Sequence, residues 1–289
     1  MILITGATGS IGRHLVRRLT AEAIPFRALV RRAEQGDELG CPYVVGDFDD
    51  PSSLDSAFAG VAKLFLNSAG AVPAAGEQPM VRQQLAAIEA ARRAGVRRIV
   101  KVSVWRAREG GKLAEGAHWH IEQALAKSGI DWAVLQPSGF MQNFLTGAGS
   151  FTEDGDLIGA YGDARVSYVD CQDIAACAAV LLTGSHGTGR AHVVTGPEAL
   201  THTEIAAKLS AAFGRPVRYV DLPPRQFADR LIAQGVPAGF AADVAALYAE
   251  VAAGALAATT TTVADFTGRP ARTFDEFLAD LPASATRTA

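Results

Sequence analysis

Short apolar runs alternate with longer segments of helical periodicity along the first half of the chain. Apolar runs that end in polar or glycine-rich turns predict buried strands. These predicted strands are residues 1–4, 25–30, 42–45, 63–67, 98–102 and 130–136. Between them, residues 12–20 and 80–94 place their apolar side chains on one face of a helix. Strands that alternate with helices predict an α/β fold with a doubly wound parallel sheet and right-handed crossovers.

The second half of the chain departs from this alternation and predicts a smaller lobe. Residues 165–170 are expected to form a strand, and residues 192–195 a strand that returns to the main sheet. Two Thr-x-x-Glu capping boxes, at Thr201 and Thr273, predict helix starts. The glycine-rich residues 147–162 are expected to be mobile. The expected division is residues 1–137 with 165–197 for the main domain, and residues 138–164 with 198–289 for an interleaved α+β lobe.

The turn after the first predicted strand carries three glycines, in the spacing Gly6-x-x-Gly9-x-x-Gly12. A glycine-rich turn that leads into a helix presents backbone N–H groups to a pyrophosphate. Gly6 permits the tight turn, Gly9 lets a phosphate approach the backbone, and Gly12 lets the helix pack against the strand. A purely structural turn is the alternative. The position at the first strand–helix junction favours a dinucleotide site, and hence a Rossmann domain.

The second predicted strand ends in Arg31 and Arg32, with no carboxylate. In a doubly wound sheet this strand end meets the adenosine ribose, where an acidic residue would accept the 2′-OH of NAD. A guanidinium instead makes charge-assisted hydrogen bonds to a 2′-phosphate. We therefore expect NADP(H) as cofactor, with a solvated surface pair of arginines as the alternative.

Composition narrows the class of protein further. The chain has 289 residues, 49% hydrophobic and 20% charged, and a net charge of −3, so it can bury a core and has no basic block for nucleic acid or a charged membrane surface. We see no charged-then-apolar leader and no apolar run of the ~18 residues that a membrane span needs. Cys41, Cys171 and Cys177 are scattered, and no Cys or His motif predicts a metal. A reduced, cytoplasmic protein is expected.

The loop Thr5-Gly-Ala-Thr-Gly-Ser-Ile-Gly12 resembles the cofactor loop of atypical and extended short-chain dehydrogenases/reductases. Two later segments narrow the resemblance to the NmrA-like branch, which includes quinone reductases, triphenylmethane reductase and non-catalytic redox sensors. One is Leu135-Gln-Pro-Ser-Gly-Phe-Met-Gln-Asn-Phe144, in which Gln136 departs from the usual arginine. The other is Tyr168-Val-Asp-x-x-Asp173-Ile-Ala. The resemblance covers nearly the whole chain.

The glycine turn and the resemblance together imply the cofactor-binding residues. These are Gly6, Thr8, Gly9, Ser10, Ile11, Gly12, Arg31, Arg32, Asp47, Phe48, Asn67, Ser68, Ser103, Gln136, Pro137 and Ser138. In the family, the segment around Asp47 borders the adenine, although a turn with an N-cap would use the same residues. The segment after Pro137 covers the nicotinamide, which implies that Phe140, Met141 and Asn143 meet the substrate. Ordinary core filling is the alternative for these three.

The Tyr-x-x-x-Lys pair of many short-chain dehydrogenases is absent. Alignment on Glu122 places His118 at the lysine register and Ala114 at the tyrosine register, and the quinone-reductase-like branch also tends to have histidine there. We take His118 as the candidate catalytic residue, because an imidazole relays a proton near neutral pH. A ribose-positioning or core histidine is the alternative, and His120 is expected at the surface.

These features predict an NADPH-dependent reductase of an aromatic or quinone-like small molecule, in secondary metabolism. A quinone-like acceptor gains aromaticity on reduction, so it needs little general-acid assistance, which suits a site without the tyrosine. Two alternatives stay open at this point. One is a non-catalytic NADP(H)-binding redox sensor that regulates a partner, and the other is non-redox chemistry such as isomerisation or coupling of aromatic rings. Substrate identity and oligomeric state are not predicted.

Overall fold

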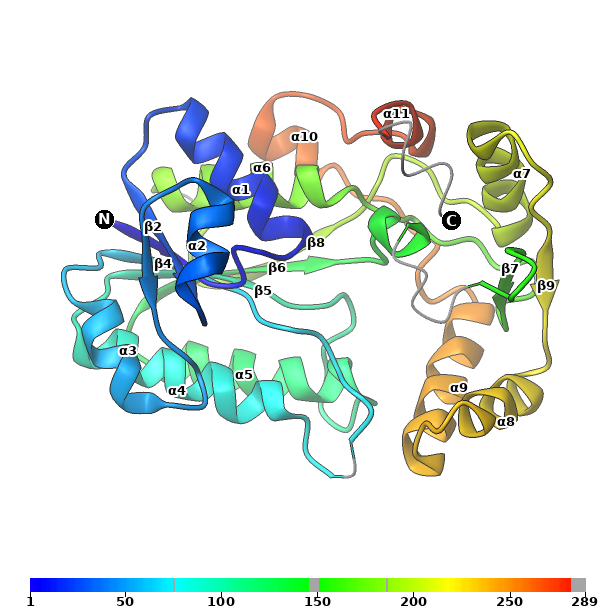
Figure 1. The fold of residues 1–289 in the computed structure, drawn as a ribbon, viewed down its shortest axis with the longest axis horizontal. Coiled ribbons are helices and arrows are strands. Elements are labelled where there is room, and N and C mark those ends of the chain that lie inside the picture. The colour runs from blue at the N-terminus through cyan, green and yellow to red at the C-terminus, as the bar shows by residue number, and fades with distance from the viewer. Residues whose placement is uncertain (75, 146–150, 186, 282–289) are drawn as a thin grey trace. The chain divides into compact units, whose positions relative to one another are not determined.

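A computed structural model describes residues 1–74, 76–145, 151–185 and 187–281 and separates the chain into two compact units (Figure 1). The first unit comprises Met1–Val72, Gly76–Pro137 and Cys171–Val193. The second comprises Pro73–Ala75, Ser138–Asp170 and Val194–Ala289. In this part of the chain no helix is both long enough and apolar enough to cross a membrane.

The first unit is a doubly wound sheet with the strand order β3-β2-β1-β4-β5-β6-β8. The strands are β1 (Ile2–Ile4), β2 (Phe26–Val30), β3 (Tyr43–Val45), β4 (Lys63–Leu66), β5 (Arg98–Val102), β6 (Asp131–Pro137) and β8 (Arg190–Val194). Strand β1 pairs in parallel with β2 on one side and with β4 on the other. In this register, Ile2 lies opposite Phe26 on β2 and Lys63 on β4. The predicted fold class and the return of residues near 192 to the main sheet are confirmed.

Helices cover both faces of this sheet. The helices are α1 (Ser10–Ala21), α2 (Ala33–Leu39), α3 (Pro51–Phe58), α4 (Pro79–Arg93), α5 (Ala114–Lys127) and α6 (Cys171–Thr183). Helices α1 and α6 lie together on one face, and α3, α4 and α5 lie side by side on the other (Figure 1). The central strands are buried on both faces, as Leu3 and Phe65 with no exposed area illustrate. This is why they appear in the sequence as continuous apolar runs.

The second unit is mainly helical around its own core. Strands β7 (Leu157–Gly159) and β9 (Tyr219–Asp221) form a small parallel sheet. The helices are the 3-10 helix Met141–Phe144, α7 (His202–Phe213), α8 (Pro224–Ala233), α9 (Ala238–Ala252), α10 (Thr262–Thr267) and α11 (Phe274–Ala279). The capping boxes at the starts of α7 and α11 are present as predicted. Phe274, Ile205 and Leu209, with no exposed area, fill the core.

Three elements differ from the sequence-based expectation. Residues 165–170 form only isolated bridges, because Val166, Ser167 and Val169 bond to three different partner segments and never share one ladder. Helix α2 has a single buried residue, Gly36, so it lacks the apolar periodicity that would predict it. Within the glycine-rich segment expected to be mobile, residues 147–150 lie outside the described part and residues 157–159 form β7.

Candidate cofactor pocket and polar network

The glycine turn joins β1 to α1 as the sequence predicts. The N–H of Gly9 donates to the carbonyl of Gly6 at 3.1 Å, and Arg13 N–H donates to the carbonyl of Gly9 at 3.0 Å. No side chain caps α1, and its first turn carries no acidic residue. Because the first backbone N–H groups of a helix lack intrahelical partners and lie at its positive end, this terminus is suited to an anion.

The three glycines serve two different purposes. A Cβ added to Gly12 would lie 2.1 Å from the Gly6 carbonyl oxygen, and Gly6 has a φ of +63°. These two positions therefore need glycine for the turn to form at all. Gly9 has a φ of −80°, and a Cβ there would only reach ordinary contact, 3.4 Å from the Gly6 oxygen. The fold itself therefore does not require glycine at position 9.

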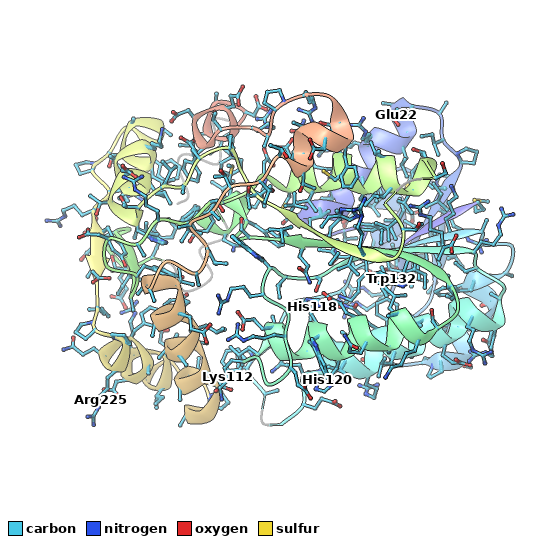
Figure 2. All side chains as sticks on the ribbon, turned by 180° about the vertical axis from the view of Figure 1, so that it is seen from behind. Glu22, Lys112, His118, His120, Trp132 and Arg225 are labelled. Carbon is cyan, nitrogen blue, oxygen red and sulfur yellow. The ribbon has the colours of Figure 1, made fainter. Side chains whose placement is uncertain are left out.

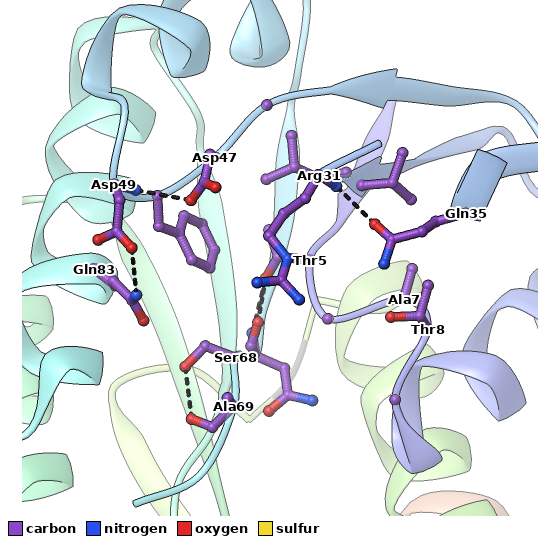
Figure 3. A pocket seen from close by; sticks show the side chains of 17 residues that line it. Thr5, Ala7, Thr8, Arg31, Gln35, Asp47, Asp49, Ser68, Ala69 and Gln83 are labelled. Atoms are coloured by element: carbon purple, nitrogen blue, oxygen red, sulfur yellow. Dashed lines mark hydrogen bonds between the residues drawn. The ribbon is translucent and has the colours of Figure 1, made fainter. Parts of the chain in front are cut away.

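A cavity of about 340 Å³ opens beside the turn, at the carboxyl ends of β1, β2 and β4 (Figure 3). Thr5 joins two of these strand ends, because its Oγ1 donates to the Asn67 carbonyl at 2.8 Å and accepts the Asn67 N–H at 2.9 Å. The lining residues are Thr5, Gly6, Ala7, Thr8, Gly9, Leu29, Val30, Arg31, Gln35, Gly46, Asp47, Phe48, Asp49, Asn67, Ser68, Ala69 and Gln83. The cavity thus contains eight of the residues predicted to bind cofactor: Gly6, Thr8, Gly9, Arg31, Asp47, Phe48, Asn67 and Ser68.

The two arginines at the end of β2 have different surroundings. Arg31 lines the cavity, whereas Arg32 does not and instead occupies the N-cap position of α2. The backbone N–H groups of both arginines donate to Oε1 of Gln35, at 3.1 and 3.3 Å, and Figure 3 shows the bond from Arg31. Gln35, which the sequence interpretation missed, also lines the cavity. Its position three residues after the N-cap was the signal that could have identified it.

Acidic and amide side chains line the side of the cavity formed after β3. The N–H of Asp49 donates to Oδ1 of Asp47 at 3.0 Å, so Asp47 also stabilises its own turn. Asp49 accepts from Gln83 Nε2 at 3.0 Å (Figure 3) and pairs with Arg82 at 2.7 Å. Asp50 caps α3. Capping of α3 therefore accounts for Asp50. Asp47, in contrast, both stabilises its own turn and lines the cavity.

A polar network lies where β5 and β6 face α5 in the same unit. The hydroxyl of Ser103, 1% exposed, donates to the carboxylate of Glu122. Gln136 Nε2 donates to both oxygens of the same carboxylate, at 3.0 and 3.1 Å. Gln136 stands where the family usually has arginine, so a neutral amide replaces a cation beside Glu122. Ser103 and Gln136 belong to this network and do not line the cavity.

Lys101 and His118 form a buried pair next to this network. Lys101 on β5 has no exposed area, and its Nζ lies 2.7 Å from His118 Nδ1 on α5. Burial lowers the pKa of Lys101 to about 7, against the opposing effect of Glu122. Burial and the nearby ammonium hold the pKa of His118 well below its ordinary value, so its imidazole is neutral at pH 7. Sequence reasoning missed Lys101, although a lysine inside a strand buried on both faces is itself a signal.

The two histidines of α5 point to opposite sides of the helix. His118, 6% exposed, faces the sheet, while His120 is exposed and rests edge-on against Trp119 with ring centroids 5.0 Å apart (Figure 2). His120 was expected at the surface and is there. No group of three His, Cys, Asp or Glu side chains within the described ranges is arranged to hold a metal ion.

The remaining predicted cofactor residues lie outside the cavity. Ser10, Ile11 and Gly12 form the first turn of α1, with Ser10 exposed and the other two buried. Pro137 is buried at the end of β6. Ser138 belongs to the second unit, where its buried hydroxyl donates to the Ser167 carbonyl.

The three residues predicted to meet substrate all belong to the second unit and differ in exposure. Met141 is 1% exposed and packs in the core of that unit, so the core-filling alternative describes its side chain. Phe140 is half-buried, and Asn143 is exposed. Phe140 and Asn143 are therefore the two of the three whose side chains remain partly accessible within their own unit.

Comparison with known proteins assigns the family. The model of the NmrA-like family matches residues 1–278. The chain belongs to this family. An NAD(P)H azoreductase of Xenophilus azovorans is 39% identical over 282 residues, 96% of each chain. A (4-alkanoyl-5-oxo-2,5-dihydrofuran-3-yl)methyl phosphate reductase of Streptomyces griseus is 37% identical over 97% of each chain.

The fold is also similar to that of a solved reductase structure. An NADPH-dependent quinone oxidoreductase from Escherichia coli, complexed with NADPH, has a TM-score of 0.82 and 30% identity, and the match covers 96% of this chain and 99% of that one. The resemblance inferred from the glycine loop and the segment 135–144 is thereby confirmed.

Proposed function

We propose that this protein is an NADPH-dependent reductase of a small aromatic compound of the quinone or azo type. It is an NADP-dependent oxidoreductase, in agreement with the azoreductase and with the quinone oxidoreductase solved with NADPH. The observation that carries the proposal is the cavity beside the glycine turn, which joins an uncapped helix N-terminus to the guanidinium of Arg31. These are two separate anion-binding elements, as a pyrophosphate and a 2′-phosphate require.

The residues around the cavity fit this cofactor. Gly9 leaves the space that a pyrophosphate would occupy, and the first N–H groups of α1 would bind its oxygens. Arg31 would bind the 2′-phosphate, with Gln35 fixing the Arg31 backbone. Asp47 and Phe48 would border the adenine, while Asn67 and Ser68 follow β4 toward the middle of the cofactor. NADPH supplies the hydride, and the protein supplies binding and orientation.

The polar network near the ends of β5 and β6 would serve the reacting end of the cofactor. In doubly wound sheets, ligands bind beyond the carboxyl ends of the strands; Ser103 directly follows β5, and Gln136 is the second-last residue of β6. His118 is the candidate catalytic residue, because its neutral imidazole can donate a hydrogen bond to an oxygen that gains charge on reduction. Quinones, azo dyes and unsaturated lactones share a conjugated electrophile, and relatives with names of all three kinds match this chain.

The test is turnover of purified protein with NADPH and a panel of quinones, azo dyes and aromatic secondary metabolites, followed by absorbance of the reduced nicotinamide. We expect oxidation of NADPH with at least one quinone or azo dye, and loss of that oxidation in Gly9→Val. Tight NADPH binding without turnover across the panel would favour the redox-sensor alternative. Conversion of an aromatic substrate without NADPH consumption would favour non-redox chemistry, and absence of NADPH binding would overturn the proposal.

A further inference from the structure

We infer that Lys101 and His118 form a two-residue proton relay, in which His118 gives a proton to the reduced substrate and Lys101 replaces it. The inference rests on the proposed reductase function and adds the source of the proton. In it His118 is the catalytic residue, and Lys101 acts through His118 as a positioning and supplying residue. Neither the glycine turn nor the cavity takes part in this step.

The hydrogen bond between the two side chains determines which imidazole nitrogen carries the proton. Lys101 Nζ lies 2.7 Å from His118 Nδ1 and donates to the Val102 carbonyl at 2.9 Å. An ammonium group only donates, so Nδ1 accepts, and the neutral imidazole then carries its proton on Nε2. Within the described part of the chain, Nε2 makes no hydrogen bond. Its N–H therefore has no protein partner among the described residues, and the relay assigns the substrate oxygen to it.

The groups that face Lys101 keep its proton transferable. On α5 these are His118 and the carboxylate of Glu122, which favours the ammonium form, whereas burial disfavours it. Ser103 on β5 and Gln136 on β6 are neutral and hold that carboxylate by hydrogen bonds. With a pKa of about 7, Lys101 is partly protonated at neutral pH, which is the range in which a group exchanges protons most effectively.

The proton and electron count closes for a quinone. NADPH supplies the hydride, which carries two electrons; when that hydride bonds to a ring carbon of the quinone, the π electrons of the conjugated carbonyl group move to its oxygen, which becomes an anion. That oxygen takes the proton from His118 Nε2 while a proton from Lys101 Nζ moves to Nδ1. The imidazole stays neutral with its proton on Nδ1, and Lys101 becomes a neutral amine. After product release, Nδ1 returns its proton to Lys101 and water reprotonates Nε2.

The experiment compares two acceptors in wild type and in Lys101→Gln. A quinone needs a proton, whereas a cationic triarylmethane dye is neutralised by hydride alone and needs none. Glutamine keeps an N–H that can bind Nδ1 but has no proton to give. We expect quinone turnover in Lys101→Gln to fall by about 10²-fold, the lower range for general acid catalysis, while dye turnover and NADPH affinity change less than about threefold. Lys101→Met should show the same loss of quinone turnover. The folded fraction of each variant, measured by thermal melting, is used to express each rate per folded molecule.

The pH profile gives a second, independent readout. Because the relay needs protonated Lys101, wild-type quinone turnover should fall as pH rises through the pKa of Lys101, near 7. This alkaline limb should be absent from dye turnover and from the residual activity of Lys101→Gln. Lys63→Met is the matched control, because Lys63 is the strand lysine of β4 whose Nζ binds the Leu182 carbonyl. It should leave both profiles unchanged.

Each outcome decides a different claim. Equal losses with quinone and dye would make Lys101 a merely structural residue and overturn the relay, as would quinone turnover in Lys101→Gln that matches wild type. Wild-type protein that reduces neither acceptor would instead contradict the proposed function. If the dye is not a substrate, the presence or absence of the alkaline limb with quinone decides the relay by itself.

Discussion

The cavity beside the glycine turn and the buried Lys101–His118 pair belong to the same unit but are built in opposite ways. The cavity relies on backbone: a missing side chain at Gly9 and free N–H groups at the start of α1. The pair relies on two side chains that share one hydrogen bond away from water. Binding of a large anionic cofactor needs space and fixed dipoles, whereas proton transfer needs groups with shifted pKa values.

The largest effect is the loss of NADPH binding expected when a side chain is added at Gly9. Gly9→Val should abolish NADPH binding while the protein still folds, because its φ of −80° suits any residue and the new side chain would fill the pyrophosphate space. Gly12→Ala should instead unfold or strongly destabilise the protein, since its Cβ would lie 2.1 Å from the Gly6 oxygen. Fluorescence titration with NADPH and thermal melting separate the two. NADPH affinity retained in Gly9→Val would mean that the loop is only a turn.

This contrast also explains what the sequence could predict. The glycine turn, the alternation of strands and helices and the arginine at the end of β2 are local patterns, so they were visible without a structure. Lys101 was missed because its role depends on His118, seventeen positions away, and no local pattern joins them. The assignment of Met141 to the substrate came from a motif, which does not show how the side chain packs; it lies in the core of the second unit. Gln35 carries a capping signal, yet α2 lacks the apolar periodicity that would have predicted the helix.

The second-largest effect is the loss of quinone turnover expected when the imidazole of His118 is removed. His118→Ala should reduce quinone turnover by about 10²-fold or more, which is typical for loss of a general acid, and should change NADPH affinity little. His120→Ala, on the opposite side of the same helix, is the matched control and should be nearly silent. Steady-state kinetics and a cofactor titration measure both. A loss confined to cofactor binding would reassign His118 to the ribose, and a loss confined to thermal stability would make it a core residue.

A more moderate loss of NADPH affinity is expected when the guanidinium of Arg31 is removed from the cavity lining. Arg31→Ala should weaken NADPH binding by roughly 10–150-fold, since a charge-assisted hydrogen bond contributes about 1.5–3 kcal/mol. NADH binding should stay nearly unchanged, because NADH has no 2′-phosphate. Arg32→Ala should have a smaller effect on NADPH, because Arg32 does not line the cavity. Equal affinities of wild-type protein for NADPH and NADH would contradict this assignment of Arg31.

The smallest effect should come from restoring the family's usual arginine in Gln136→Arg. Glu122 raises the pKa of Lys101, and an arginine that pairs with this carboxylate would offset that contribution and add a cation nearby. The pKa of Lys101 should therefore fall further. Because the relay needs the protonated lysine, the alkaline limb of quinone turnover should move to lower pH, by less than about one unit for a partly screened charge. Gln136→Met removes the amide without adding charge, so it separates the electrostatic effect from loss of the hydrogen bond. A limb that moves to higher pH in Gln136→Arg would show that Glu122 does not control Lys101.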